Sequence, residues 1–109
     1  MSIAADLIRG HTDSIILAQL AEKDSYGYEI NKTIQEVTDG GYELKEATLY
    51  SAFRRLEGQK LISSYWGDEN TGARRRYYKI TDAGRAQLEK NREEWRRSRK
   101  LIDRMIMGG

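Results

Sequence analysis

The chain has 109 residues, of which 19 are Lys or Arg and 17 are Asp or Glu, for a net charge of +2, and a single domain of this length buries one modest core. It contains no cysteine and one histidine, which excludes disulfides, thiolate metal sites and cysteine nucleophiles and gives no basis for an enzyme, a cofactor or a metal site. Because no apolar run approaches the roughly 20 residues that span a bilayer, and the N-terminus lacks a signal-peptide layout, we expect a cytoplasmic protein.

Charge is divided unevenly along the chain. Residues 1–73 hold 7 Lys and Arg against 12 Asp and Glu, whereas residues 74–109 hold 12 against 5. A small domain with one basic pole is suited to a polyanion, because each phosphate contact releases counterions. For residues 85–104, a solvated helix with salt-bridged charges is the alternative interpretation.

The first predicted element is a helix at residues 3–22. Its apolar residues follow helical spacing around a dense centre at 15–17, and Ser2 is in position to cap it. Because these apolar residues cover more than one face, we expect more than one packing partner, one of them a second subunit.

A second helix is predicted at residues 26–38. Ser25 is its expected N-cap, and the Asp-Gly-Gly segment at 39–41 ends it. The short segment 42–44 is a candidate for a third, minor strand that pairs with a hairpin further along the chain.

Residues 46–57 predict a third, amphipathic helix. Its apolar side chains recur at i, i+3, i+4 and i+7 and therefore share one face. They are Leu49, Ala52, Phe53 and Leu56. The opposite face is polar and carries Thr48, Ser51, Arg54 and Arg55, with Tyr50 on the flank. We expect Gly58 to end this helix in a left-handed conformation.

A β-hairpin is predicted to follow. Residues 61–66 and 73–80 are rich in β-branched and aromatic residues, and they bracket a glycine-bounded turn at 67–72. Tyr77 and Tyr78 are adjacent on the return strand, so they face opposite sides of the hairpin and at least one of them is a core residue.

The return strand opens with Arg74, Arg75 and Arg76. A helix with a polar outer face, followed by a hairpin with arginines near its tip, is typical of the recognition helix and wing of a winged helix-turn-helix. The natural ligand of such a fold is duplex DNA.

The last predicted element is a helix at residues 82–107, capped by Thr81. About 25 residues make it roughly 38 Å long, more than the core of so small a domain can cover. Leu88, Trp95 and Ile102 recur every seven positions, which is the spacing of a seam against another helix.

These elements predict an α+β fold that is mainly α. Residues 1–80 form a winged helix-turn-helix DNA-binding domain, and residues 81–109 form a long C-terminal dimerisation helix. The exposed apolar seam of that helix predicts a homodimer.

Four motifs occur in order along the chain. They are Tyr-Gly-Tyr-Glu-Ile at 26–30, Ala-Thr-Leu-Tyr at 47–50, Arg-Leu-Glu at 55–57 leading into Leu-Ile at 61–62, and Arg-Arg-Arg-Tyr-Tyr-Lys-Ile-Thr at 74–81 with a glycine at 84. Together they resemble the PadR family of bacterial transcriptional regulators, over about residues 12–106. The chain is most similar to the short subfamily with a single C-terminal helix, which includes a lactococcal multidrug-sensing repressor.

The resemblance implies a homodimer in which the last helix of one subunit packs on the first and last helices of the other. Two recognition helices would then meet palindromic double-stranded DNA. It also implies repression of efflux or detoxification genes, relieved when a small molecule binds. We therefore expect a sequence-specific DNA-binding transcriptional repressor.

The resemblance also assigns DNA contacts. The recognition helix would enter the major groove, while the wing arginines meet phosphates or the minor groove. The expected contacts are Tyr26, Lys45, Ala47, Thr48, Tyr50, Ser51, Arg54, Arg74 and Arg75. Which of Tyr26 and Tyr28 reaches a phosphate stays open.

Trp95 matches a family position that lines a pore between subunits, where a planar effector is sandwiched. The expected effector contacts are Leu7, His11, Ser14, Leu88, Arg92, Trp95 and Arg99. Arg92 and Arg99 stand one turn to either side of Trp95, so an anionic or neutral aromatic ligand suits the pore better than a cationic one. The expected dimer contacts are Ile8, Ile15, Leu88, Trp95, Ile102, Met105 and Ile106.

Two alternatives stay open at this point. If Trp95 is plain interface packing, the protein is a DNA-binding regulator without a ligand. A winged-helix protein-interaction module without DNA binding is the other alternative, although the wing arginines and the polar recognition face argue against it.

Overall fold

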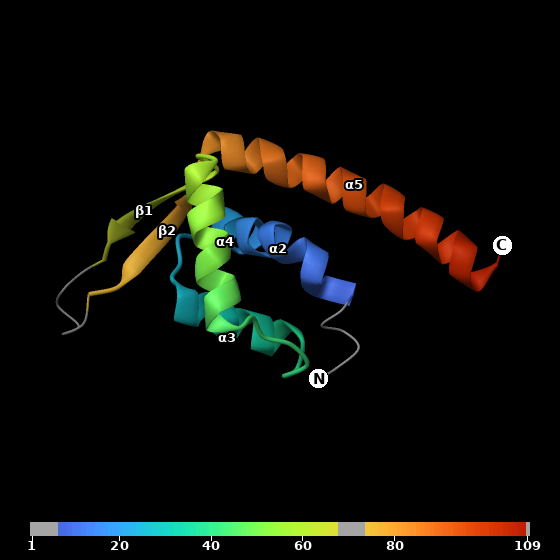
Figure 1. Ribbon diagram of the computed structural model, residues 1–109, viewed down its shortest axis with the longest axis horizontal. Coiled ribbons are helices and arrows are strands. Elements are labelled where there is room, and N and C mark those ends of the chain that lie inside the picture. The colour runs from blue at the N-terminus through green and yellow to red at the C-terminus, as the bar shows by residue number, and fades with distance from the viewer. Residues whose placement is uncertain (1–6, 68–73, 109) are drawn as a thin grey trace.

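The computed structural model describes residues 7–67 and 74–108, so the expected cap at Ser2 and most of the turn at 67–72 lie outside the described residues. The elements are η1 (Arg9–His11), α2 (Thr12–Glu22), α3 (Gly27–Val37), α4 (Glu46–Gly58), β1 (Ile62–Trp66), β2 (Arg76–Ile80) and α5 (Asp82–Met107). Figure 1 shows α2, α3, α4 and the hairpin gathered together, while α5 starts among them and runs far beyond. The molecule is elongated, with extents of 56 × 31 × 21 Å. The predicted fold class, mainly helical with a small antiparallel sheet, is confirmed.

One apolar core joins α2, α3, α4, the hairpin and the first turns of α5. Its buried members are Ile16, Leu17, Leu20, Ile30, Ile34, Leu44, Leu49, Ala52, Phe53, Leu56, Ile62, Tyr78, Ile80 and Leu88. All four residues predicted on the apolar face of α4 are among them, so that prediction is confirmed. Phe53 lies flat on Tyr78, with ring centroids 3.9 Å apart, and this contact packs α4 against the hairpin.

The first helix differs from the prediction. A 3-10 turn at Arg9–His11 precedes α2, which begins at Thr12. Gly10 weakens an α-helix at this point, and the Thr12 hydroxyl donates to the carbonyl of Arg9 at 3.3 Å. The continuous helix predicted for residues 3–22 is therefore wrong at Arg9–His11.

Ser25 does not cap α3, contrary to the prediction. The helix begins at Gly27, and its N-cap is Tyr26. Ser25 instead pairs with Tyr78 through two backbone hydrogen bonds, of 3.1 and 2.7 Å, and its hydroxyl donates to Glu29 at 2.7 Å. The link between α2 and α3 is thereby fixed to the hairpin.

The third strand predicted at residues 42–44 does not form. The side-chain amide of Asn31 donates to the Leu44 carbonyl at 2.7 Å and accepts from the Leu44 N–H at 2.8 Å. A side chain thus supplies both bonds that a neighbouring strand would have made. This arrangement fixes the segment that leads into α4.

α4 ends at Gly58, which is still helical, and the left-handed residue follows two positions later at Lys60, with a φ of 62°. The N–H of Leu61 donates to the carbonyl of Leu56 and that of Lys60 to Glu57, each at 3.0 Å, which is the Schellman pattern. The prediction that Gly58 is the left-handed residue is wrong, because the return of Leu61 to the core decides where the helix stops.

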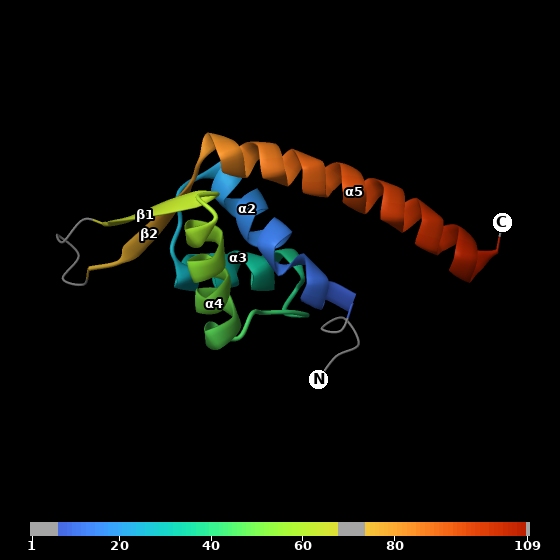
Figure 2. The same cartoon turned by 45° about the horizontal axis from the view of Figure 1, so that its top comes forward.

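The hairpin is antiparallel and pairs Ser64 with Tyr78 and Trp66 with Arg76. Tyr78 is buried, whereas its neighbour Tyr77 is only half-buried on the other face, as predicted. Figure 2 shows the hairpin reaching away from the helices in the direction opposite to the far end of α5.

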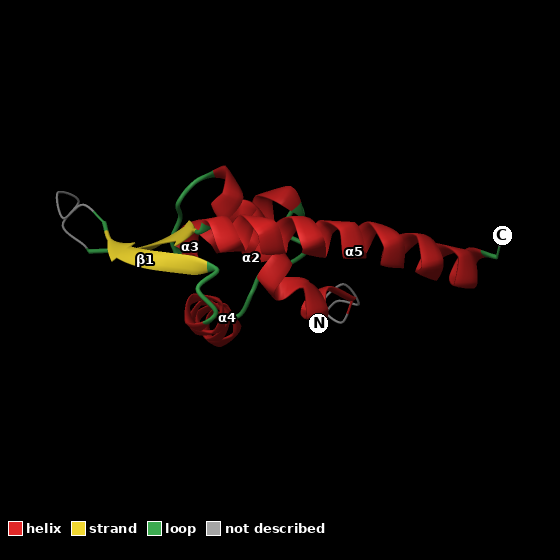
Figure 3. Cartoon of the chain, turned by 90° about the horizontal axis from the view of Figure 1, so that it is seen from above, coloured by secondary structure: helices red, strands yellow, loops and turns green. Residues whose placement is uncertain are grey.

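α5 begins against the core and then leaves it. The side chain of Thr81 accepts from the Gly84 N–H at 3.0 Å, which confirms the predicted cap. Leu88 is the last buried residue in the described part of α5. Seen from above in Figure 3, α5 and the hairpin extend along the long direction of the molecule, and α4 is viewed nearly end-on. None of the helices in the described ranges is long and apolar enough to cross a membrane.

Replacing Gly84 by alanine should lower the free energy of unfolding by about 1–3 kcal/mol. A Cβ at this position would lie 2.1 Å from the carbonyl oxygen of Leu61 and 2.7 Å from Ile80 Cγ1, so the backbone would have to shift. The matched control is Gly58→Ala, whose Cβ meets nothing within 4 Å and which should raise stability by up to about 1 kcal/mol. Urea unfolding at equal protein concentrations measures both, and an undiminished stability of Gly84→Ala would contradict the close packing.

Candidate nucleic-acid interface

α4 has a cavity on each of its two exposed flanks. The cavity on the side of the hairpin, which we call the wing cleft, has a volume of about 660 Å³. Its lining residues are Tyr26, Gly27, Tyr28, Tyr50, Arg54, Glu57, Trp66, Arg74, Arg75, Arg76 and Tyr78. The described lining therefore collects four arginines and a single carboxylate, which makes the wing cleft strongly cationic.

Two of the wing arginines lie against aromatic rings. The Arg75 guanidinium is 4.9 Å from the ring centroid of Tyr26, and that of Arg74 is 4.8 Å from the ring centroid of Trp66. A ring holds the face of a guanidinium while its N–H groups point outward in the plane, where phosphate oxygens can accept from them. Both arginine residues are exposed, as a contact to a polyanion requires.

Arg76 is held by polar groups. Its Nη2 donates to Ser64 Oγ at 2.8 Å and lies 3.5 Å from Glu57 Oε1. The Ser64 hydroxyl in turn donates to Glu57 Oε2 at 2.6 Å. These three groups connect the last turn of α4 to both strands. Sequence reasoning missed Glu57, because its partners are 7 and 19 positions away and no periodicity relates them.

The other face of the hairpin is tied to the link between α2 and α3. The Tyr65 hydroxyl donates to Asp24 at 2.6 Å, and this bond, with smaller effects from burial and the Asp24 charge, raises the pKa of Tyr65 to about 12. Tyr77 stacks on Tyr65 and meets the Tyr26 ring edge-to-face, with centroids 5.2 Å apart. Tyr26 is thereby held at the start of α3, whereas the side chain of Tyr28 is exposed.

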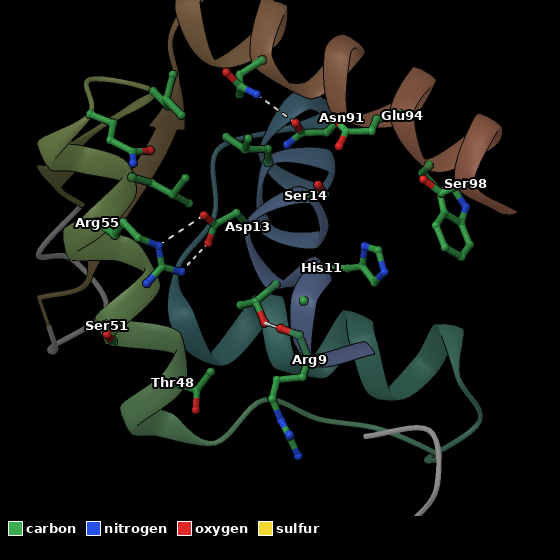
Figure 4. Close-up of a pocket in the computed structure, with 18 of the residues that line it drawn as sticks. Arg9, His11, Asp13, Ser14, Thr48, Ser51, Arg55, Asn91, Glu94 and Ser98 are labelled. Atoms are coloured by element: carbon green, nitrogen blue, oxygen red, sulfur yellow. Dashed lines mark hydrogen bonds and ion pairs between the residues drawn. The ribbon is translucent and has the colours of Figure 1, made fainter. Parts of the chain in front are cut away.

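The cavity on the other flank of α4, which we call the inner groove, has a volume of about 1080 Å³. Its walls come from α4, from α2 with the turn before it, and from α5. The α4 residues in it are Ala47, Thr48, Ser51, Arg55 and Leu56. Figure 4 shows Thr48 and Ser51 on α4 and, across the groove, Asn91, Glu94 and Ser98 on α5.

The polar face predicted for α4 is therefore shared between two cavities. Tyr50 and Arg54 line the wing cleft, whereas Thr48 and Ser51 line the inner groove. Lys45, the N-cap residue of α4, is exposed but makes no side-chain cap. All the positions predicted on α4 for DNA contact are exposed, and they surround its outer side.

An ion pair joins α2 to α4 within the inner groove. Arg55 Nε donates to Asp13 Oδ2 at 3.2 Å, and Arg55 Nη2 pairs with the other carboxylate oxygen. The hydrogen bond to Asp13 raises the pKa of Arg55. Both side chains are at least one-third exposed, so the pair contributes little to stability but fixes the distance between the first turn of α2 and the last turns of α4.

The inner groove also brings together three of the predicted effector contacts. The His11 ring meets the Trp95 indole edge-to-face, with centroids 5.0 Å apart, and Ser14 lines the same groove. The polar residues of α5 beside Trp95 in this lining are Asn91, Glu94 and Ser98.

Four predicted effector contacts lie elsewhere. Leu7 is exposed, and neither it nor Arg92 nor Arg99 is among the described residues that line the groove. Arg92 pairs with Glu89 of the preceding turn at 2.6 Å. Leu88 is only 2% exposed and packs in the core of its own chain, so it is out of reach for a ligand or a second subunit.

The second half of α5 carries an apolar stripe on its surface. Trp95 and Ile102 are 43% and 45% exposed, and Met105 and Ile106 are more exposed still. Of the other predicted dimer contacts, Ile8 and Ile15 are half-buried, and Ile15 packs against the core.

Comparison with known proteins supplies relatives of this fold. Residues 16–90 match the transcriptional regulator PadR-like family. The structure of a transcriptional regulator from Clostridium thermocellum is 50% identical, with a TM-score of 0.83 and coverage of 91% of this chain and 96% of that one. A PadR family transcription regulator from Clostridium difficile is 39% identical, with a TM-score of 0.77 and coverage of 88% and 98%. An uncharacterised protein of Lysinibacillus sphaericus is 45% identical over 106 residues, 97% of each chain.

Proposed function

Because the chain belongs to the PadR-like family of transcriptional regulators, we propose that it is a sequence-specific DNA-binding repressor that acts as a homodimer on a palindromic operator. The observation that carries this proposal is the wing cleft. Its four arginines against one carboxylate form a surface suited to a phosphate backbone, because each phosphate that they neutralise releases counterions. The alternative of a protein-interaction module offers no reason for that concentration of guanidinium groups.

In this proposal α4 enters the major groove. Its exposed side carries Ala47, Thr48, Ser51 and Arg54, which offer a methyl group, two hydroxyls and a guanidinium to base edges. Lys45, at the start of the helix, faces the DNA backbone. Side chains on both flanks of one exposed helix can reach both sides of the groove, which suits recognition of several successive base pairs.

The wing and the start of α3 then contact the DNA backbone beside that groove. Arg74 and Arg75 meet phosphates or enter the minor groove, and the ring of Tyr26 packs against the guanidinium of Arg75. These contacts position the protein, because phosphates carry no sequence information directly.

The apolar stripe of α5 supports the homodimer. Exposed apolar surface costs roughly 25 cal/mol per Å² relative to burial, so Trp95, Ile102, Met105 and Ile106 favour a partner helix. A second copy supplies the same stripe, and the resulting two-fold axis places two copies of α4 on a palindrome. In this proposal the DNA-binding part comprises residues 1–80 together with the first turns of α5, as far as Leu88. The rest of residues 81–109 forms the dimer contact.

The inner groove supports a small aromatic effector as the second half of the proposal. Trp95 and His11 offer ring surfaces, and the polar groups beside them are an amide, a carboxylate and a hydroxyl. Of the anionic and neutral aromatic ligands that Arg92 and Arg99 predicted, a neutral planar one with hydrogen-bond donors therefore fits this groove better. The Asp13–Arg55 pair lines the same groove, so a ligand that extends from Trp95 toward α4 can disturb the helix that reads DNA.

Replacing Arg74 and Arg75 by alanine together should weaken binding to all DNA sequences. Each lost phosphate contact makes the slope of log K against log salt less negative, by roughly one unit in each half-site. Thr48→Ala or Ser51→Ala should instead change the preference among sequences. Fluorescence anisotropy of labelled duplexes across a salt titration measures both effects.

The matched control for the wing is Arg96→Ala with Arg97→Ala, which removes the same charge from α5. This control should leave the salt slope nearly unchanged. Equal slopes for the wild type and for the double wing variant would contradict the role of the wing.

Replacing Ile102 and Ile106 by aspartate should convert the dimer into a monomer, because both lie on the exposed apolar stripe. Lys100→Asp with Arg104→Asp, on the opposite side of the same helix by the 3.6-residue period, is the control that should stay dimeric. Sedimentation velocity at micromolar concentration distinguishes the two states. A monomeric wild type would refute the homodimer.

A neutral planar aromatic compound should quench the fluorescence of Trp95 more strongly than an anionic one of the same ring system. A Trp66→Phe background leaves Trp95 as the single indole, since the chain has two tryptophans. Saturating operator DNA should weaken ligand binding by the same factor by which ligand weakens DNA binding, with a coupling of about 1–3 kcal/mol. If no planar compound of either charge quenches Trp95, this residue is interface packing and the regulator acts without a ligand.

A further inference from the structure

Glu57 is the one carboxylate among the described residues that line the wing cleft. If the cleft receives a phosphate backbone, a carboxylate in it repels the ligand, and a surface selected only for charge would not contain one. Glu57 must therefore be explained by what it does to the protein.

The contacts of Glu57 use both of its oxygens on the hairpin. One oxygen accepts from the Ser64 hydroxyl of β1 at 2.6 Å, and the other lies 3.5 Å from the Arg76 guanidinium of β2. Arg76 also donates to Ser64 at 2.8 Å, so each of these three side chains contacts the other two. Because Ser64 pairs with Tyr78, two residues from Arg76, the two hairpin groups lie on the same face of the sheet, and the carboxylate holds both strands at once.

This tie holds the face of the hairpin that carries Ser64 and Arg76 to the last turn of α4, whereas Tyr65 and Tyr77 hold the other face to Asp24 and Tyr26. Apolar contacts hold the base of the hairpin through Ile62 and Ile80, and the backbone bond from Thr81 to Leu61 closes it at 3.1 Å. Further out, the residues of the strands are mostly exposed. A tilt at the base moves Arg74 and Arg75 by a larger amount than the base itself, because they precede β2 at the outer end.

We propose that Glu57 is a positioning residue for DNA recognition: it locks the wing at a fixed angle to α4, so that the wing arginines and the base-reading side chains engage the same half-site together. The inference rests on the proposed function. It adds that the regulator accepts an unfavourable charge in its DNA surface in exchange for a fixed geometry.

Charge and geometry predict opposite results for Glu57→Gln. The substitution removes a negative charge from the cleft, so electrostatics alone predicts tighter binding to every duplex and an unchanged preference among sequences. A positioning role predicts that binding to the operator weakens while binding to unrelated DNA does not. We expect the ratio of operator affinity to non-specific affinity to fall by roughly tenfold.

Ser64→Ala tests the same tie without any change of charge. It removes the hydroxyl that donates to Glu57 and accepts from Arg76, and we expect the affinity ratio to fall as it does in Glu57→Gln. Ser63→Ala is the matched control, because it removes the neighbouring hydroxyl of the same strand, which is exposed on the opposite face. In the double variant of Glu57 and Ser64 the losses should not add, since both substitutions break one network.

The experiment begins with wild-type protein and a pool of random 30-base-pair duplexes. Selection for binding yields an operator-like duplex, and affinities for it and for the unselected pool are then measured across a salt titration. Thermal unfolding of each variant should remain within a few degrees of the wild type. If Glu57 has a positioning role, the slope of log K against log salt for the selected duplex becomes less negative in Glu57→Gln and Ser64→Ala. The reason is that the wing loses its phosphate contacts in the specific complex only.

The outcomes separate the inference from the function on which it rests. If the wild type enriches no sequence from the pool, the proposed function fails and the inference fails with it. If the wild type binds selectively but Glu57→Gln binds every duplex more tightly with an unchanged ratio, Glu57 is an incidental charge and only the inference is overturned. An unchanged ratio in Ser64→Ala overturns it as well.

Discussion

The stacking of Phe53 on Tyr78 is the contact on which the rest of the structure depends. The two rings lie 3.9 Å apart and nearly parallel, and both are buried. Phe53 belongs to α4 and Tyr78 to the hairpin, and the backbone of Tyr78 also pairs with Ser25 between α2 and α3. Burial raises the pKa of the Tyr78 hydroxyl above its ordinary value. One ring contact thus places the helix, the wing and the α2–α3 link together, and it leaves the opposite side of α4 in water.

Apolar contact decides that elements touch, but it is non-directional and leaves their angles loosely defined. Hydrogen bonds supply the angles here. Asn31 fixes the approach to α4, Tyr65 holds the outer face of the hairpin to Asp24, and Glu57 holds the inner face to α4. A typical intramolecular hydrogen bond contributes only about 0.5–1.5 kcal/mol, less where water competes for the same groups. Such bonds therefore contribute more to the geometry of the interface than to the stability of the fold.

The wing cleft and the inner groove give α4 two different surroundings. On one flank it shares a cationic cleft with the wing, and on the other it shares the inner groove with α2 and α5. The Asp13–Arg55 pair spans the second flank, and the ring contact of His11 with Trp95 connects the same groove to α5. Any coupling between the groove and DNA can therefore act over a short path of direct contacts. The exposed stripe further along α5 continues from Trp95, so the proposed dimer contact and the groove adjoin each other.

The sequence by itself determined the apolar face of α4, the hairpin, the cap at Thr81 and the extent of α5, because helical period, strand alternation and capping depend on residues a few positions apart. Tertiary structure alone decided the left-handed stop at Lys60, the pairing of Ser25, and the burial of Leu88 within its own chain. The same limit applies to the site. Residue types predicted the arginines and the recognition helix, whereas the split of α4 between two cavities, the absence of Arg92 and Arg99 from the described lining of the inner groove, and the network at Glu57 depend on groups far apart in the chain. Local patterns fix which face of an element is apolar, but only packing fixes which partner meets it and at what angle.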